Sequence, residues 1–332
     1  MPTILDFNIK ADHQKGYSLQ VTERGKPEPL AESSFSYDVS FLKEFEIRQL
    51  DADPKDPQGR LERLRKFGAN LFNTVFTKDI LTVWQAYKKK QDFLILCVRI
   101  DPDADELEIV PWETLYDGEE FISAGVKTGM ARLPLDIPPE DTLPAVPLPI
   151  KMLAFISSPL DLREGERLQI EREQEILLQA TNAPSGQGKL HVEFEDEAKL
   201  TILENSLEAG DNIFHYSGHG ISPENGSGLL FEDADGKKKP VPVHELLQSF
   251  GKGAGSLRLA VLSGCQTAKT LNIAGFRDLT RGLLHQKVPG VLAMQFSISD
   301  SAGLSLAENL YSRIPEGKTL EMVLSACRRA ML

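Results

Sequence analysis

A histidine and a cysteine, each following a short apolar run, are the residues of this sequence best suited to chemistry. His219 lies in His-Tyr-Ser-Gly-His-Gly (215–220), and Cys265 lies 46 positions later in Leu-Ser-Gly-Cys-Gln-Thr (262–267). Imidazole has the pKa that suits a base at neutral pH, and a deprotonated thiol is a strong nucleophile. The pair therefore predicts nucleophilic catalysis by a Cys–His dyad.

The neighbours of the two residues favour this interpretation over a structural one. A cysteine at the end of an apolar strand is often an inert, buried side chain. Here Gly264 precedes the cysteine and polar Gln266 follows it, which favours an accessible thiol. Gly218 and Gly220 flank the histidine, and Gly220 allows a substrate carbonyl to approach its backbone N–H closely.

The second half of the chain alternates β-rich apolar runs with segments of helical spacing. The expected strands are Lys151–Ser157, Leu190–Glu195, Asn212–Ser217, Gly228–Phe231, Leu257–Ser263 and Gly290–Ser297. The expected helices are Glu166–Thr181, Ala198–Glu208, Val243–Phe250, Phe276–Gln286, Ser301–Ser312 and Leu320–Leu332. This alternation predicts an α/β fold with a mostly parallel sheet and helices on both faces, with chemistry at the carboxyl ends of the strands.

The first half of the chain predicts a separate α+β region. Residues 137–149 contain five prolines and read as a linker. We therefore divide the chain into an accessory region at 1–136, the linker, and a second domain at 150–332. In the accessory region we expect strands at Tyr17–Glu23, Tyr37–Phe41 and Phe93–Ile100, helices at Leu61–Phe76 and Ile80–Lys90, and further β structure at Glu108–Leu115 and Phe121–Leu133.

Composition narrows the classes of partner and compartment. The net charge of −12 argues against nucleic acid as a partner, and no apolar run approaches the ~20 residues of a membrane span. The three cysteines are too scattered for a disulfide framework or a zinc cluster. We expect a cytoplasmic protein without cofactor or metal, in which Cys97 and Cys327 are core residues.

Motifs along nearly the whole chain resemble the CHAT family, caspase-like cysteine proteases of clan CD related to separase and caspases. The two motifs above carry the resemblance, together with Gly-Leu-Leu-Phe-Glu-Asp (228–233), the segment Val288–Asp300 and the closing helix. In the first half, Val110–Gly118 and Met130-Ala-Arg-Leu133 resemble the segment that precedes the protease core in this family. The resemblance implies a caspase-like fold, with a pseudo-caspase-like accessory region packed on it.

The resemblance also implies roles for individual residues. Cys265 would be the nucleophile and His219 the general base, while the backbone N–H groups of Gly220 and Cys265 would bind the oxyanion. Asp300 would recognise a basic residue before the scissile bond, or else it caps the helix that follows. Glu232 and Asp233 would border the substrate groove, or else form a solvated turn.

Three further features have competing interpretations. His215 lies four residues before His219, and a buried histidine bonded to backbone is favoured over a metal ligand. Trp112 and Glu113 read as a packing anchor joining the halves. The sequence stops at Leu332 within an amphipathic helix that has no capping Gly or Asn, which indicates a module cut from a longer protein.

The function implied is that of a regulated bacterial signalling or antiviral defence protease. It would cleave a specific protein, such as a pore-former encoded by a neighbouring gene, under the control of a sensor domain or a partner protein. One alternative is a catalytically silent scaffold or oligomerisation module. A weaker alternative is another thiol enzyme, although Thr267 stands where an amidotransferase-like elbow would need glycine.

Overall fold

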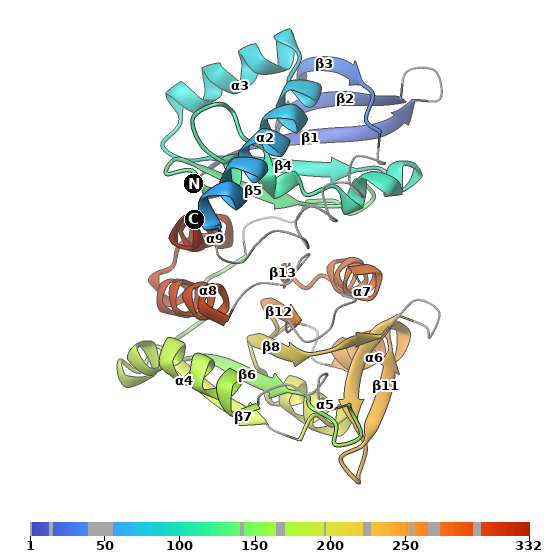
Figure 1. Ribbon diagram of the computed structural model, residues 1–332, viewed down its shortest axis with the longest axis vertical. Coiled ribbons are helices and arrows are strands. Elements are labelled where there is room, and N and C mark those ends of the chain that lie inside the picture. Colours follow the sequence, from blue (N-terminus) through green and yellow to red (C-terminus); the bar gives the residue numbers. More distant parts are fainter. Residues whose placement is uncertain are drawn as a thin grey trace. The chain divides into compact units, whose positions relative to one another are not determined.

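The protein divides into two compact units, each with its own sheet and core (Figure 1). The computed structural model describes residues 2–12, 16–38, 56–139, 143–163, 170–195, 197–221, 227–252, 255–264, 273–294 and 300–332. The first unit comprises Met1–Asp141 and Thr319–Leu332, and the second comprises Thr142–Lys318. In the sequence, the second unit is therefore inserted between the two segments of the first.

The sheet of the first unit is mixed and has the order β3-β2-β1-β4-β5. Its strands are β1 (Thr3–Asp12), β2 (Gly16–Glu23), β3 (Pro29–Phe35), β4 (Leu94–Ile100) and β5 (Thr128–Arg132). The first three are antiparallel neighbours, and β4 and β5 run parallel to β1. Leu5, Phe7 and Ile9 of β1 point to the core face of the sheet, while Asp6 is buried on the other face.

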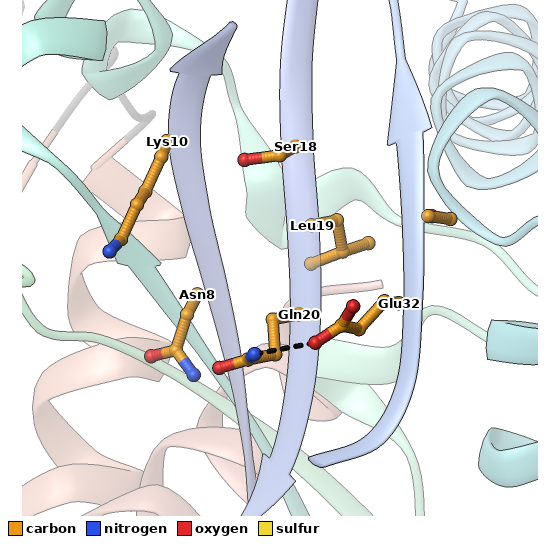
Figure 2. Close-up of a pocket in the computed structure, with 7 residues that line it drawn as sticks. Asn8, Lys10, Ser18, Leu19, Gln20 and Glu32 are labelled. Carbon is orange, nitrogen blue, oxygen red and sulfur yellow. Dashed lines mark hydrogen bonds between the residues drawn. The ribbon is translucent and has the colours of Figure 1, made fainter.

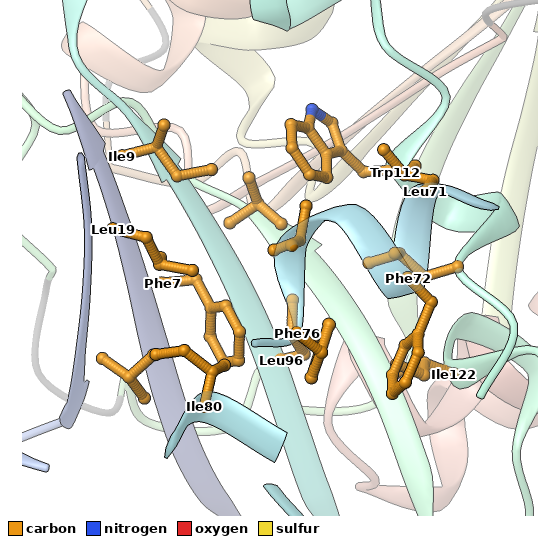
Figure 3. Packing of buried hydrophobic residues seen from close by; sticks show 14 of the residues in the cluster. Phe7, Ile9, Leu19, Leu71, Phe72, Phe76, Ile80, Leu96, Trp112 and Ile122 are labelled. Carbon is orange, nitrogen blue, oxygen red and sulfur yellow. The ribbon is translucent and has the colours of Figure 1, made fainter. Parts of the chain in front are cut away.

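Among the described residues, the first unit has two long helices, three 3₁₀ turns and the final helix. They are α2 (Pro57–Val75), α3 (Lys78–Lys90), η1 (Pro102–Ile109), η2 (Trp112–Thr114), η3 (Ile122–Ala124) and α9 (Leu320–Met331). Helix α2 begins with a proline after Asp56, whose carboxylate accepts a hydrogen bond from Gly59 N–H. Figure 3 shows Phe76, the residue after α2, together with Ile80 of α3 and Trp112 of η2 in the core of this unit.

The final helix α9 belongs to the first unit, whereas the sequence division assigned it to the second domain. It packs beside β5 and η3. The hydroxyl of Ser325 lies 2.7 Å from the carbonyl oxygen of Gly125 and 2.8 Å from that of Thr128. Arg329 donates to the carbonyl of Ala124 at 3.1 Å. These buried polar contacts attach the helix to the edge of the first sheet.

The sheet of the second unit is entirely parallel, with the order β13-β12-β8-β6-β7. Its strands are β6 (Ile150–Ile156), β7 (Leu190–Glu195), β8 (Ile213–Gly218), β12 (Leu259–Gly264) and β13 (Gly290–Ala293). The central strand β8 is buried throughout and reads as a continuous run rather than an alternating one, as expected for a parallel strand covered on both faces. The predicted fold class is confirmed.

Helices cover both faces of this sheet. They are α4 (Ile170–Gly186), α5 (Leu200–Ala209), α6 (Val243–Lys252), α7 (Ile273–His285) and α8 (Asp300–Arg313), with η5 (Ile314–Glu316) after α8. Phe214 and Tyr216 of β8 share a core cluster with residues of α5, α6 and α7. His215 points to the opposite face, where it contacts Tyr311 of α8. Helices α4 and α8 pack together.

An antiparallel three-stranded sheet lies beside the parallel one. It has the order β11-β10-β9 and consists of β9 (Gly220–Ile221), β10 (Gly228–Glu232) and β11 (Lys238–Pro242). Strand β9 follows β8 after one residue, so this small sheet starts at the carboxyl edge of the large one.

Several predicted elements differ from those observed. The β structure predicted at Glu108–Leu115 is wrong, because Pro102 and Pro111 open 3₁₀ turns there. The helix predicted to end at Thr181 continues to Gly186 and includes Pro184 in its last turn. Part of the strand predicted at Tyr37–Phe41 lies outside the described residues. Within the described ranges, no helix combines the length and apolarity that a membrane crossing requires.

Candidate active site

The carboxyl ends of β8 and β12, where the two candidate motifs begin, are neighbours in the parallel sheet. The two strands are parallel, and their last paired residues are Gly218 and Gly264. His219 follows the first of these glycines, in the gap between β8 and β9. Cys265 follows the second glycine in the sequence and lies outside the described residues. The register therefore aligns the positions that immediately precede the predicted dyad.

The third strand at this edge contributes two serines. Ser157 follows β6, and its N–H donates to the carbonyl of Ser217 at 2.9 Å. Its hydroxyl donates to the carbonyl of Leu230 in β10 at 2.5 Å. Sequence reasoning missed this residue, although a Ser-Ser pair directly after an apolar strand was a usable signal. Ser157 thus joins the parallel sheet to the small antiparallel one.

Gly218 is required by the position of a tyrosine hydroxyl. A Cβ atom at this position would lie 2.2 Å from the Tyr216 hydroxyl oxygen and 2.3 Å from its Cζ. The Tyr216 ring is completely buried and stacks on Phe231 with centroids 6.0 Å apart. The ring therefore has little freedom to move aside. The glycine before His219 has a packing cause that is independent of any substrate.

The backbone around His219 is fixed from two sides. Its carbonyl oxygen accepts hydrogen bonds from the N–H of Leu230 at 2.8 Å and from the hydroxyl of Tyr216 at 3.0 Å. The next residue, Gly220, begins β9 and pairs with Leu229 of β10. The His219 side chain is half-buried. Hydrogen bonds to the backbone thus hold the segment that carries His219 and Gly220.

The carboxylates of Glu232 and Asp233 both accept hydrogen bonds from backbone N–H groups. Glu232 is buried and accepts a hydrogen bond from the N–H of Ser158 at 2.9 Å. Asp233 accepts from the N–H groups of Asp235 and Lys237 at 2.9 and 2.8 Å, which closes the turn between β10 and β11. The contact with Ser158 brings Glu232 to the end of β6. A substrate role for either carboxylate stays a prediction.

Asp300 is the first residue of helix α8. Its side chain and the five residues before it lie outside the described part of the chain, so the two interpretations of Asp300 both stand. The helix it opens packs against α4 and carries Tyr311 into contact with β8.

His215 belongs to a buried hydrogen-bonded chain. Its Nδ1 contacts the hydroxyl of Tyr311, and its Nε2 lies 3.2 Å from the hydroxyl of Ser217. Ser217 in turn donates to Glu173 of α4 at 3.2 Å. No group of three or more potential metal-binding side chains occurs among the residues the structure describes. Burial lowers the pKa of His215 to about 4, so the imidazole is neutral at physiological pH.

We expect His215 to make the protein less stable as the pH falls from about 6.5 to about 4. An unfolded chain has a histidine pKa near 6.5, while burial lowers the pKa of His215 to about 4. Protons therefore bind to the unfolded chain first in this window, and the free energy of unfolding falls by roughly 3 kcal/mol. Urea unfolding followed by far-UV circular dichroism at several pH values measures the slope.

The variant His215→Gln should flatten this part of the pH dependence, because glutamine does not titrate. The matched control is His191→Gln, which removes an exposed histidine from β7. If the slope between pH 6.5 and 4 persists in His215→Gln, another group causes it.

The tryptophan-containing motif of the first half is an anchor within the first unit. Trp112 is buried in the core of that unit, and its indole N–H donates to the carbonyl of Leu107 at 2.9 Å. Glu113 accepts a hydrogen bond from Arg132 at 2.9 Å. Arg132 belongs to Met130-Ala-Arg-Leu133, so one ion pair joins the two first-half motifs. Cys97 and Cys327 are buried, which confirms them as core residues.

A polar hollow on the first unit lies away from all the candidate residues in sequence. It has a volume of about 280 Å³ and is lined by strands β1, β2 and β3. Figure 2 shows Lys10 and Asn8 beside the hydrogen bond between Gln20 and Glu32. Neither a cysteine nor a histidine lines it, so it adds nothing to the dyad.

Comparison with known protein families gives a match over most of the chain. The model of the family described as "CHAT domain" matches residues 65–332. This range covers more than half of the chain, begins within α2 and includes both candidate motifs. No curated protein matches the sequence.

Proposed function

The chain belongs to the CHAT domain family, a family of caspase-like protease relatives, and we propose that it is a cysteine endopeptidase. The observation that carries the proposal is the pairing of Gly218 with Gly264 at the carboxyl ends of β8 and β12. Two residues that follow paired positions on adjacent parallel strands start from the same edge of the sheet. In this chain those residues are a histidine and a cysteine, the types that a thiol protease needs.

In the proposed first step, His219 takes the proton from the thiol of Cys265. The sulfur then attacks the scissile carbonyl and forms a tetrahedral intermediate with a negatively charged oxygen. The backbone N–H groups of Gly220 and Cys265 donate hydrogen bonds to this oxygen. The hydrogen bonds that hold the carbonyl of His219 support this role for Gly220, because they fix the peptide group that contains its N–H.

In the second step, the C–N bond breaks and the protonated His219 gives its proton to the leaving amine. The acyl group remains on the sulfur of Cys265 as a thioester. His219 then deprotonates a water molecule that attacks the thioester, which releases the carboxylic acid and regenerates the thiol. Neither step needs a cofactor.

The finer assignments extend the same proposal. We propose that Asp300, at the start of α8, recognises a basic residue before the scissile bond. We also propose that the enzyme is a regulated protease of bacterial defence, which cleaves one protein such as a pore-former when a sensor domain or partner activates it. The support for this biological role is the family resemblance.

Cleavage of a peptide library tests the proposal. We expect hydrolysis of internal peptide bonds, with at least about tenfold higher kcat/KM after Arg or Lys than after Leu or Met, because an acidic side chain in the pocket would pair with the basic one. The measurement is mass spectrometry of the products obtained with the full 332-residue chain. Asp300→Asn should remove most of the preference for basic residues.

Two outcomes would change the proposal. Cleavage that is indifferent to basic residues would remove Asp300 from the pocket and leave the dyad in place. The absence of both cleavage and covalent labelling of Cys265 by an electrophilic peptide would instead favour a catalytically silent scaffold.

A further inference from the structure

Two hydroxyl groups, of Tyr216 and Ser157, lie against two backbone carbonyl groups, of His219 and Leu230. The hydroxyl oxygen of Tyr216 lies 3.0 Å from the carbonyl oxygen of His219 and 2.9 Å from that of Leu230. The hydroxyl of Ser157 donates to the same Leu230 carbonyl at 2.5 Å. Tyr216 and Ser157 are both buried, with 0% and 1% of their surface exposed.

The number of protons decides which hydroxyl serves which carbonyl. Each hydroxyl has one proton to donate. The hydroxyl of Ser157 also lies within hydrogen-bond reach of the Tyr216 hydroxyl. We assign the Ser157 proton to the carbonyl of Leu230, because that contact is short at 2.5 Å. The proton of Tyr216 then goes to the carbonyl of His219. Burial raises the pKa of Tyr216 well above its ordinary value, so this hydroxyl keeps its proton at neutral pH.

The geometry of the peptide bond carries this restraint to Gly220. The carbonyl of His219 and the N–H of Gly220 belong to one planar trans peptide group, in which they point in opposite directions. The carbonyl faces β10, because it also accepts from the N–H of Leu230 at 2.8 Å. The N–H of Gly220 therefore points away from β10. Any rotation of this peptide group must break the hydrogen bonds from Leu230 and Tyr216.

We infer that the hydroxyl of Tyr216 is a positioning group for catalysis, which fixes the direction of the Gly220 N–H that binds the oxyanion. The inference rests on the proposed function, in which Gly220 donates to the tetrahedral intermediate. Tyr216 acts through the peptide group and does not touch the substrate. Preorganised donors contribute most when they need no reorientation during the reaction, and a second anchor on the carbonyl supplies that rigidity.

The test is the variant Tyr216→Phe in the full chain. Phenylalanine keeps the ring that stacks on Phe231 and removes only the hydroxyl. We expect kcat for peptide hydrolysis to fall about tenfold with KM unchanged, since loss of a whole oxyanion donor costs about 10²–10³ in kcat and here the donor is only loosened. The Leu230 N–H still holds the carbonyl, which limits the loss.

Alkylation by chloroacetamide separates positioning from a general structural effect. Displacement of chloride at a saturated carbon forms no oxyanion, so the rate depends on the thiolate and its access. We expect chloroacetamide to alkylate Cys265 in Tyr216→Phe as fast as in the unchanged protein. The variant should nevertheless hydrolyse peptides more slowly. A parallel loss in both reactions would show a structural role and overturn the inference.

The matched control is Tyr311→Phe, which removes the hydroxyl of another fully buried tyrosine on the opposite face of β8. We expect Tyr311→Phe to lose stability but to keep kcat. If Tyr216→Phe does not fold, Ser157→Ala serves instead: the Leu230 carbonyl then competes for the Tyr216 proton, and kcat should fall about threefold with alkylation unchanged.

The outcomes distinguish this inference from the proposed function. An unchanged protein that neither hydrolyses peptides nor reacts selectively at Cys265 contradicts the proposed function and the inference with it. An unchanged protein that cleaves, together with a Tyr216→Phe or Ser157→Ala variant that cleaves equally fast, contradicts the inference alone.

Discussion

Replacing Cys265 with alanine is expected to reduce peptide hydrolysis by about 10⁴-fold or more, because the variant has no nucleophile to form the acyl intermediate. The folded protein should be retained, since the pairing of Gly218 with Gly264 does not involve the thiol. The initial rate of cleavage of the best library peptide measures the first effect, and thermal unfolding measures the second. Full activity in this variant would contradict the dyad.

Another cysteine of the chain, Cys97, provides a matched control. Cys97 is fully buried in β4, and burial raises the pKa of its thiol to about 12, so it is not a thiolate at neutral pH. Cys97→Ala should therefore lower stability by leaving a small cavity while the activity per folded molecule stays unchanged.

His219→Ala should cost about as much activity as Cys265→Ala, and the double variant little more, because the two residues act as a unit.

Replacing Gly218 with alanine is expected to impair both stability and catalysis. The new Cβ would lie 2.2 Å from the Tyr216 hydroxyl oxygen, in a core where the ring stacks on Phe231. Either the ring or the end of β8 must shift, and such overpacking costs about 1–3 kcal/mol of unfolding free energy. The shift also moves the His219 backbone, so kcat should fall further than in Tyr216→Phe. Urea unfolding and peptide cleavage on one preparation measure both.

The control for this glycine is Gly251→Ala in helix α6. No atom outside its own helix neighbourhood lies within 4 Å of a Cβ built there. Alanine is the better helix former, so stability should stay unchanged or rise by up to about 1 kcal/mol. If Gly218→Ala is as stable and active as Gly251→Ala, Tyr216 does not occupy the space that the structure gives it.

Periodicity in the sequence was sufficient to predict the parallel core. The strands β6, β7 and β8 and the helix α6 of this core lie where apolar runs and helical spacing indicated them, as does α9 of the first unit. The cause is local: a strand buried on both faces must be apolar throughout, and a helix on a sheet must be apolar on one side. Both requirements are visible within a window of a few residues.

Strands with mixed composition were missed for a different reason. In β1, Leu5, Phe7 and Ile9 alternate with Asp6 and polar neighbours, so the apolar signal is diluted by half. Strand β11 contains lysines and two prolines but lies at an edge, where proline costs fewer ladder hydrogen bonds. Pairing with a remote strand stabilises both, and a single local window does not contain that partner.

The candidate site was predictable only in part. The motifs indicated His219 and its glycines, and the register of β8 and β12 agrees with strand ends that meet. The roles of Tyr216 and Ser157 depend on the carbonyl of Leu230, which belongs to the hairpin of β10 and β11. Glu232 likewise bonds to Ser158, 74 positions away. Contacts of such sequence separation follow from topology, which short motifs do not encode.

The return of helix α9 to the first unit affects how the protein is made. The second unit, Thr142–Lys318, is continuous in sequence, so it can fold on the ribosome as soon as it emerges. Most of the first unit is synthesised earlier. Its fold is complete only when residues 319–332 have been made and α9 can pack beside β5 and η3. The part synthesised first is therefore completed last. Until then, the edge where Ser325 will bond to Gly125 and Thr128 is open to chaperones or to mispairing.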